Sequence, residues 1–163
     1  MNRTLIALVE DKPGVLNRVA SLFRRRAFNI ASLTVGHTER SGVSRMTIVV
    51  DSHRTDVQKV AQNLRKLVNV IGVEDVTEKP SVVRDLALIR VKANSGTRAE
   101  VLQLVEAFRA RVVDVGLDTL IVEVTGIEEK VDGLVEVLRP FGIEEMVRTG
   151  RVAMVRGTNG CSE

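Results

Sequence analysis

The chain has 163 residues, a formal net charge of +3 and 44% hydrophobic residues, which is enough for one domain or two small ones. Trp and Tyr are absent, only four Phe occur and Cys161 is the single cysteine, so we expect an aliphatic core without an internal disulfide or a cysteine-only metal site. No apolar run is long enough for a signal peptide or a membrane span, which favours a cytoplasmic protein with no membrane partner.

The first elements follow from hydrophobic periodicity. An apolar run over 4–10 predicts a strand, and apolar residues from Val15 to Phe23 recur at helical spacing. Pro13 is expected in the first helical turn, and Asp11 is expected to cap the free amides of that turn. The pattern gives the order β-α-β-β-α-β, with the further elements at 28–37, 45–51, 57–68 and 70–76.

The same order then occurs a second time. Shifting the chain by 85 positions aligns FRRRAFNI at 23–30 with FRARVVDV at 108–115, so an internal duplication is the simplest interpretation. Pro80 is a breaker within the junction between the two halves. The second set comprises a strand over 86–93, a helix over 96–111, a hairpin over 112–126, a helix over 128–141 and a strand over 144–156.

Two such units predict an α+β protein with tandem ferredoxin-like βαββαβ domains, each an antiparallel sheet with both helices on one face. We expect the N-terminal domain over 1–78, a linker over 79–85, the C-terminal domain over 86–157 and a disordered tail over 158–163. Neither face of the central strands is wholly polar, so each open sheet face is expected to pair with another unit or another chain. The sequence therefore predicts a homodimer or a larger homo-oligomer.

The residues indicate binding and offer no catalytic apparatus. His37 and His53 have no cysteine or carboxylate at metal-ligand spacing, and no nucleophile motif or phosphate loop occurs, so we expect no catalytic and no metal residues. Basic side chains exceed acidic ones in residues 1–80, 13 against 8, while residues 81–163 carry 11 against 13. This excess lacks the interleaved aromatics of a nucleic-acid surface, and no nucleic-acid partner is expected.

One constellation fits a small ligand. The amides around Gly14 and Val15 lie at a predicted helix N-terminus, which favours a carboxylate, and Gly14 lets a ligand approach the backbone. Asp11 could hold an ammonium group, and Asn29 offers an acceptor and two donors. With an aliphatic wall from Ile30, these groups describe a site for an amino acid, and a branched one would suit the wall.

Three segments resemble a known family. They are PGVLNRVASLF at 13–23, NIASLTVG at 29–36 and SRMTIVV at 44–50. Together they closely resemble the ACT domain that opens the regulatory (small) subunit of acetohydroxyacid synthase, also called acetolactate synthase. The likeness continues through KLVNVIGVEDVT and RDLALIRVKA into the second half, so that half would be a C-terminal ACT-like domain and the resemblance covers nearly the whole chain.

The resemblance implies a non-catalytic subunit that binds the large catalytic subunit, raises its activity and confers feedback inhibition by valine or another branched-chain amino acid. Thiamine diphosphate, Mg²⁺ and FAD would all lie on that partner, and none on this chain. In the family the effector lies between two ACT domains, which selects Asp11, Gly14 and Val15 from one chain and Asn29 and Ile30 from the other.

Two departures and two alternatives accompany this reading. The family often has Asn at the position of Asp11, whose full charge should attract the ammonium of the ligand and repel its carboxylate. In the second unit Asp114 aligns with Asn29 and no Pro-Gly step occurs, so that unit is expected to bind no effector by these contacts.

The alternatives are a free-standing ACT-type amino-acid sensor and an RNA-binding ferredoxin-like module. The latter would need stacking aromatics on its central strands, and the sequence has none there.

Overall fold

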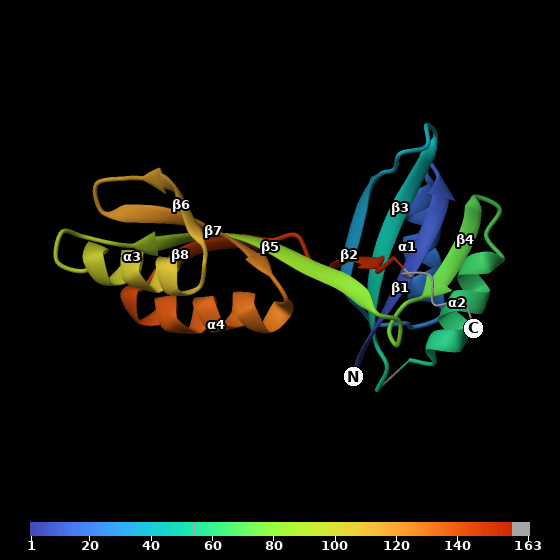
Figure 1. Ribbon diagram of the computed structural model, residues 1–163. Coiled ribbons are helices and arrows are strands. Elements are labelled where there is room, and N and C mark those ends of the chain that lie inside the picture. Colours follow the sequence, from blue (N-terminus) through green and yellow to red (C-terminus); the bar gives the residue numbers. More distant parts are fainter. Residues whose placement is uncertain (54, 158–163) are drawn as a thin grey trace. The chain divides into compact units, whose positions relative to one another are not determined.

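A computed structural model describes residues 1–53 and 55–157, and the chain in it divides into two compact units (Figure 1). Unit 1 comprises Met1–Val82 together with the described residues from Arg151 onward, and unit 2 is Val83–Gly150. The tail expected at 158–163 lies outside the described residues.

Unit 1 is a four-stranded antiparallel sheet in the order β2-β3-β1-β4, with both helices against one face (Figure 1). Alternation along β1 directs Leu5, Ala7 and Val9 toward the helices, where they join a single apolar core. From the helices, Val19 and Leu64 are fully buried in that core. The elements are β1 (Asn2–Glu10), α1 (Val15–Arg25), β2 (Ile30–His37), β3 (Val43–Asp51), α2 (Val57–Arg65) and β4 (Val70–Asp75).

Unit 2 repeats this architecture with the sheet order β6-β7-β5-β8. Ile89, Val122 and Leu134 are fully buried in its own aliphatic core, so the prediction of two antiparallel βαββαβ units is confirmed. The elements are β5 (Ser81–Lys92), α3 (Arg98–Ala107), β6 (Arg111–Val115), β7 (Thr119–Gly126), α4 (Glu128–Leu138), the 3₁₀ turn η1 (Arg139–Phe141) and β8 (Ile143–Arg148).

An ionic cluster secures β8 to the rest of unit 2. Arg148 contacts Asp132 on α4 at 2.6 Å and the buried Asp85 on β5 at 2.9 Å. Burial opposes the charge of Arg148, but hydrogen bonds to Asp132 and Asp85 outweigh it and raise the pKa of Arg148 above its ordinary value. The guanidinium therefore stays charged and ties β8 to both neighbours.

The structure differs from the sequence-based boundaries in two places. Strand β5 begins at Ser81, within the range expected to be a linker, because the β-branched Val82 and Val83 follow Ser81. The final strand expected over 144–156 is two strands, β8 and β9 (Val152–Val155), and β9 belongs to unit 1. Gly150 separates them with a φ of 82°, which lies outside the strand region.

The C-terminal segment of unit 1 contacts the sheet face opposite the helices. Thr4, Ile6 and Val49 point to that face and are nevertheless almost completely buried. The side chain of Arg45 donates to the carbonyl oxygen of Ala153 at 2.7 Å, and Arg151 donates to Oγ1 of Thr4 at 2.9 Å. The sequence predicted that another unit or chain would cover this sheet face. At these contacts the face is instead covered by the chain's own segment around Arg151 and Ala153.

Candidate functional site

The loop between β1 and α1 is built around Gly14. This residue is the N-cap of α1 and has φ 84° and ψ −6°, a left-handed conformation that glycine adopts without strain. The helix begins at Val15, so Pro13 lies in the preceding turn, and its prediction as a first-turn residue is wrong. A Cβ placed on Gly14 would meet no heavy atom within 4 Å, so the loop is open in front of it.

Asp11 does not cap the helix, contrary to the prediction. The N-cap is Gly14, and within the described residues no side chain makes a capping hydrogen bond there. The backbone N–H of Asp11 instead donates to the carbonyl oxygen of Gly42 at 2.9 Å. This contact with the β2–β3 turn places the Asp11 carboxylate 3.4 Å from Nδ1 of His37. The sequence analysis did not predict this contact with His37. The contact arises because β1 and β2 run parallel, so that their C-terminal ends lie on the same side of the sheet.

A polar network holds this loop in place. Oε2 of Glu10 accepts from Nζ of Lys12 at 2.6 Å and from Nδ2 of Asn69 at 3.4 Å. Both bonds lower the pKa of Glu10, and the bond from Lys12 has the larger effect. Oδ1 of Asn69 accepts from Nη1 of Arg18 on α1. The backbone N–H of Glu10 also donates to the carbonyl oxygen of Asn69 at 2.8 Å. The end of β1 is therefore tied to the first turns of α1.

The start of α1 offers backbone donors to an anion. An α-helix leaves its first N–H groups without intrahelical acceptors, and no described side chain caps them here. The amide of Val15 is only weakly engaged, at 3.4 Å from the carbonyl oxygen of Lys12. The side chain of Val15 is buried in the core of unit 1, so this residue can offer a ligand its backbone alone.

Asn29 and Ile30 mark the beginning of β2. The backbone of Asn29 donates to Oγ1 of Thr55 at 3.4 Å and accepts from the N–H of Asp51 at 3.3 Å. Its side chain is exposed, and none of the residues at 1–53 and 55–157 holds its amide group. Ile30 is partly buried against the core, so only part of its side chain can serve as an aliphatic wall.

The two halves of the predicted site lie apart in a single chain. Ile30 pairs with Val50, which pairs with Arg3, whereas Asp11 follows Glu10 at the other end of β1. The strand from Arg3 to Glu10 separates them by about 23 Å at about 3.3 Å per residue. One chain therefore brings together Asp11, Gly14 and the amide of Val15, but not Asn29 or Ile30.

The corresponding loop of unit 2 is already filled by its own side chains. Oδ1 of Asn94 accepts from the amides of Gly96 and Thr97 at 2.8 and 3.0 Å. Nη2 of Arg98 donates to the carbonyl oxygens of Gly116 and Leu117 at 2.8 and 2.7 Å. The loop before α3 thus holds a side-chain acceptor for its own amides, whereas the loop before α1 holds none, which favours unit 1 as the site for a ligand.

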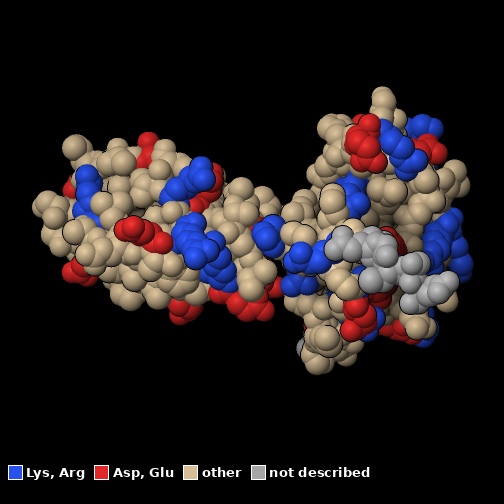
Figure 2. All heavy atoms as spheres, in the orientation of Figure 1, with Lys and Arg blue, Asp and Glu red and all other residues tan. Residues whose placement is uncertain are grey.

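Other kinds of site find little support in the described part of the chain. No group of three or more His, Cys, Asp or Glu that could hold a metal ion occurs there. None of the helices described is both long and apolar enough to cross a membrane. On the face in Figure 2, basic and acidic side chains are interspersed among uncharged ones and form no continuous basic stripe.

Comparisons with known proteins give the same family for both halves of the chain. A family model described as the AHAS small subunit-like ACT domain matches residues 5–72, and one described as the small subunit of acetolactate synthase matches residues 84–157. The chain is 55% identical over 157 residues to the probable acetolactate synthase small subunit of Archaeoglobus fulgidus, covering 96% of this chain and 98% of that protein. It is 46% identical over 159 residues to the Bacillus subtilis small subunit, covering 97% and 92%.

A solved structure gives the same result. The crystal structure of the acetolactate synthase small subunit from Thermotoga maritima superposes with a TM-score of 0.89 at 39% sequence identity. The match covers 96% of this chain and 98% of that one.

Proposed function

The chain belongs to the family of acetolactate synthase small subunits, and from this premise we propose that it activates the large catalytic subunit and makes it sensitive to valine or another branched-chain amino acid. Membership in the family makes the chain a regulatory subunit in branched-chain amino-acid biosynthesis, with the large subunit as its partner. Activation and the identity of the effector are the proposed part.

The observation that supports the proposal is the position of β2 at an edge of its sheet. An edge strand exposes unpaired backbone groups, and two copies related by a two-fold axis can pair such edges antiparallel. Antiparallel pairing sets the start of β2 in one chain beside the end of β2 in the other. Asp11 lies at that end, as its contact with His37 indicates, so Asn29 and Ile30 of the second chain would approach Asp11 and Gly14 of the first.

The groups gathered in this way suit the two charged ends of an amino acid. The free first-turn amides and the positive end of the helix dipole favour the carboxylate. The carboxylate of Asp11 would attract the ammonium group, and the exposed amide of Asn29 could bond to either end. The exposed part of Ile30 would contact a branched aliphatic side chain, which favours valine, isoleucine or leucine.

Regulation would follow from a site shared between two chains. A ligand that touches both chains binds only the arrangement in which the half-sites meet, and it can shift the equilibrium only by its differential affinity for that arrangement. The shift would pass to the large subunit across their interface. The reaction itself, with its thiamine diphosphate, Mg²⁺ and FAD, would stay on the large subunit.

Reconstitution tests the proposal. The purified large subunit should gain activity when this chain is added, and one branched-chain amino acid should inhibit only the reconstituted pair. Valine, isoleucine and leucine are assayed separately over a concentration series. A large subunit whose activity and amino-acid sensitivity do not change on addition of the chain would contradict the proposal.

The family match disfavours the alternative of a free-standing amino-acid sensor. Such a sensor would use the same loop but would have no need of the large subunit. Co-purification from cells separates the two, because the regulatory-subunit proposal requires a large subunit of about 60 kDa to accompany the chain, as expected from the family resemblance.

A further inference from the structure

Two contacts join the loop before α1 to the hairpin of β2 and β3. The backbone N–H of Asp11 donates to the carbonyl oxygen of Gly42 at 2.9 Å, and Oδ2 of Asp11 lies 3.4 Å from Nδ1 of His37. The hairpin is itself held closed, because the backbone N–H and Oγ1 of Thr38 both donate to the carbonyl oxygen of Val43, at 3.2 and 2.8 Å. The backbone of His37 is therefore fixed at the end of β2, where its side chain reaches the carboxylate of Asp11.

The pair of Asp11 and His37 can carry two different charges. Imidazole is the side-chain group that ordinarily changes its charge between about pH 5 and 8. A neutral imidazole can donate one hydrogen bond from Nδ1, which leaves the carboxylate with its full negative charge. A protonated imidazole at 3.4 Å places a positive charge beside Oδ2 of Asp11 and cancels much of the negative one. A ligand thus meets a negative group when the imidazole is neutral and a nearly uncharged pair when it is protonated.

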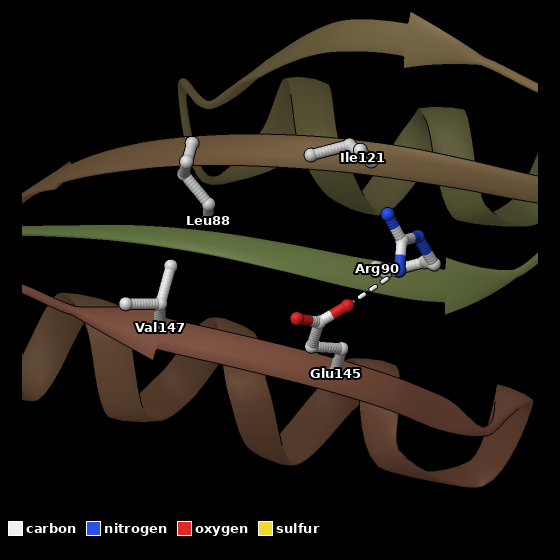
Figure 3. Close-up of a pocket in the computed structure, with 5 residues that line it drawn as sticks. All are labelled: Leu88, Arg90, Ile121, Glu145 and Val147. Carbon is white, nitrogen blue, oxygen red and sulfur yellow. Dashed lines mark hydrogen bonds and ion pairs between the residues drawn. The ribbon is translucent and has the colours of Figure 1, made fainter.

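The elements around this pair carry other charged side chains, but these are of types that do not titrate near neutrality. Carboxylates ordinarily titrate near pH 4, and Lys and Arg above about pH 10. Such side chains here are Glu10 and Lys12 in the loop, Arg18 on α1, Glu39 and Arg40 in the hairpin turn, and Arg45 on β3. On β3 the residue paired with His37 is the uncharged Ser44. The ion pair of Arg90 and Glu145 on the sheet of unit 2 also joins two groups of these types (Figure 3).

The position of His37 places it where two chains are proposed to meet. Strand β2 is at the edge of its sheet, and the side chain of His37 is 86% exposed in the single chain. Antiparallel pairing of two β2 edges would set the end of one strand beside the start of the other, so His37 of one chain would approach Ile30 of the second. Cover by the second chain would reduce screening by solvent and strengthen the interaction of His37 with Asp11.

We propose that His37 is a specificity-determining residue of the amino-acid site, which positions the carboxylate of Asp11 for the ammonium group of the ligand and weakens binding when it is protonated. This inference rests on the proposed function, in which the ammonium group lies nearer to Asp11 than the ligand's carboxylate does. Protonation of His37 then removes more attraction for the ammonium group than repulsion of the carboxylate. Affinity for the amino acid therefore falls as the pH falls, and feedback inhibition is relaxed in acid.

Isothermal titration calorimetry on the full-length chain tests this role, with valine, isoleucine and leucine titrated separately between pH 5.5 and 8. For the amino acid that binds, affinity should rise about two- to fivefold with pH, which corresponds to the energies of exposed ion pairs. At pH 6.5, binding should also release protons, and the measured heat should depend on the ionisation enthalpy of the buffer. A purely structural role of His37 would produce neither effect.

Two variants separate His37 from the other histidine. His37→Gln keeps a side-chain donor that does not titrate, so the pH dependence and the proton release should both disappear. His53→Gln is the matched control, since the chain has only these two histidines. The backbone N–H of His53 donates to Oδ1 of Asp51, whose own N–H donates to the carbonyl oxygen of Asn29, so His53 lies near the start of β2. The His53 variant should keep both effects.

The outcomes distinguish the role of His37 from the proposed function. Affinity that is constant between pH 5.5 and 8, or that falls as the pH rises, would overturn the role of His37 and leave the proposed function standing. The same conclusion would follow if the pH dependence persisted in the His37→Gln variant or disappeared in the His53→Gln variant. If none of the three amino acids binds at any pH, the proposed function fails, and the role of His37 fails with it.

Discussion

The loops that precede α1 and α3 occupy equivalent places in two units of the same topology, yet only the loop before α3 holds a side-chain acceptor for its backbone amides. In unit 1, Gly14 caps the helix without a side chain and faces open space. In unit 2, Asn94 accepts from the amides of Gly96 and Thr97. A duplicated fold can therefore keep one loop open while a side chain of the other loop binds its own amides.

The second difference between the units concerns the faces opposite the helices. Unit 1 buries Thr4 and Val49 on that face and contacts it with the segment that contains Ala153. Unit 2 leaves Val147 exposed on its equivalent face. In the proposed function only unit 1 binds a ligand, and the following predictions test that division between the units.

The largest expected effect comes from matched cavities in the two cores. Leu64 on α2 and Leu134 on α4 are fully buried, so Leu64→Ala and Leu134→Ala should each lower the free energy of unfolding of their own unit by about 2–5 kcal/mol. Thermal unfolding with and without valine is the measurement. Valine should raise the unfolding temperature of unit 1 in the Leu64→Ala variant. It should leave the unfolding temperature of unit 2 in the Leu134→Ala variant unchanged. Equal shifts in both would contradict a site confined to unit 1.

Gly14→Asp should have the next largest effect. It places a negative charge where the carboxylate of the ligand is expected, so the valine concentration for half inhibition should rise about 10- to 100-fold, which is about 1.4–2.8 kcal/mol. Activation of the large subunit should persist. Gly14→Asn is the control, since Asn also tolerates a positive φ but carries no charge, and it should impair inhibition less. Normal inhibition of the Asp variant would remove this loop from the site.

Asn29→Ala tests the half-site that the second chain would contribute. Loss of its amide group should weaken valine binding about tenfold, the cost of a hydrogen bond to a charged group. Isothermal calorimetry on the full chain gives the affinity. The matched control is Asp114→Ala at the corresponding position of unit 2, which should bind valine as the wild type does. Unchanged affinity in the Asn29 variant would exclude that residue.

Asn94→Ala should have the smallest effect. Removing its side chain leaves the amides of Gly96 and Thr97 without their acceptor, which should cost unit 2 about 1 kcal/mol of stability. Urea unfolding measures the change. Valine affinity should stay constant, and a variant that bound additional valine in unit 2 would show that Asn94 alone closes the second loop.

The architecture could be predicted from the sequence because it follows from local patterns. The apolar residues of β1 and α1 change from a strand period to a helical one around Pro13 and Gly14, and the second half repeats the order. The boundaries of two strands differ from those that the sequence predicts. Val82 and Val83 extend β5 into the expected linker, and Gly150 divides the expected last strand in two.

The candidate site could be predicted only in part. Gly14 and the amides that follow it could be predicted from a turn at a helix N-terminus, and the structure leaves open space in front of Gly14. The prediction that Asp11 caps the helix was wrong, because α1 begins at Val15 and the residue before it, Gly14, is the N-cap. Contacts of Asp11 with Gly42 and His37 could not be predicted, since they depend on where the β2–β3 hairpin lies.

By itself, the sequence determined the two βαββαβ units and their aliphatic cores, and it predicted an anion site at the loop of Gly14. Each of these depends on residues that are neighbours along the chain or recur at a fixed period. Only the tertiary structure decided that Asn69 secures the end of β1, that the segment at Ala153 returns to the first sheet, and that Asn29 starts its strand at the far end from Gly14. Strand register and long-range packing set these relations, and neither leaves a periodic signal in the sequence.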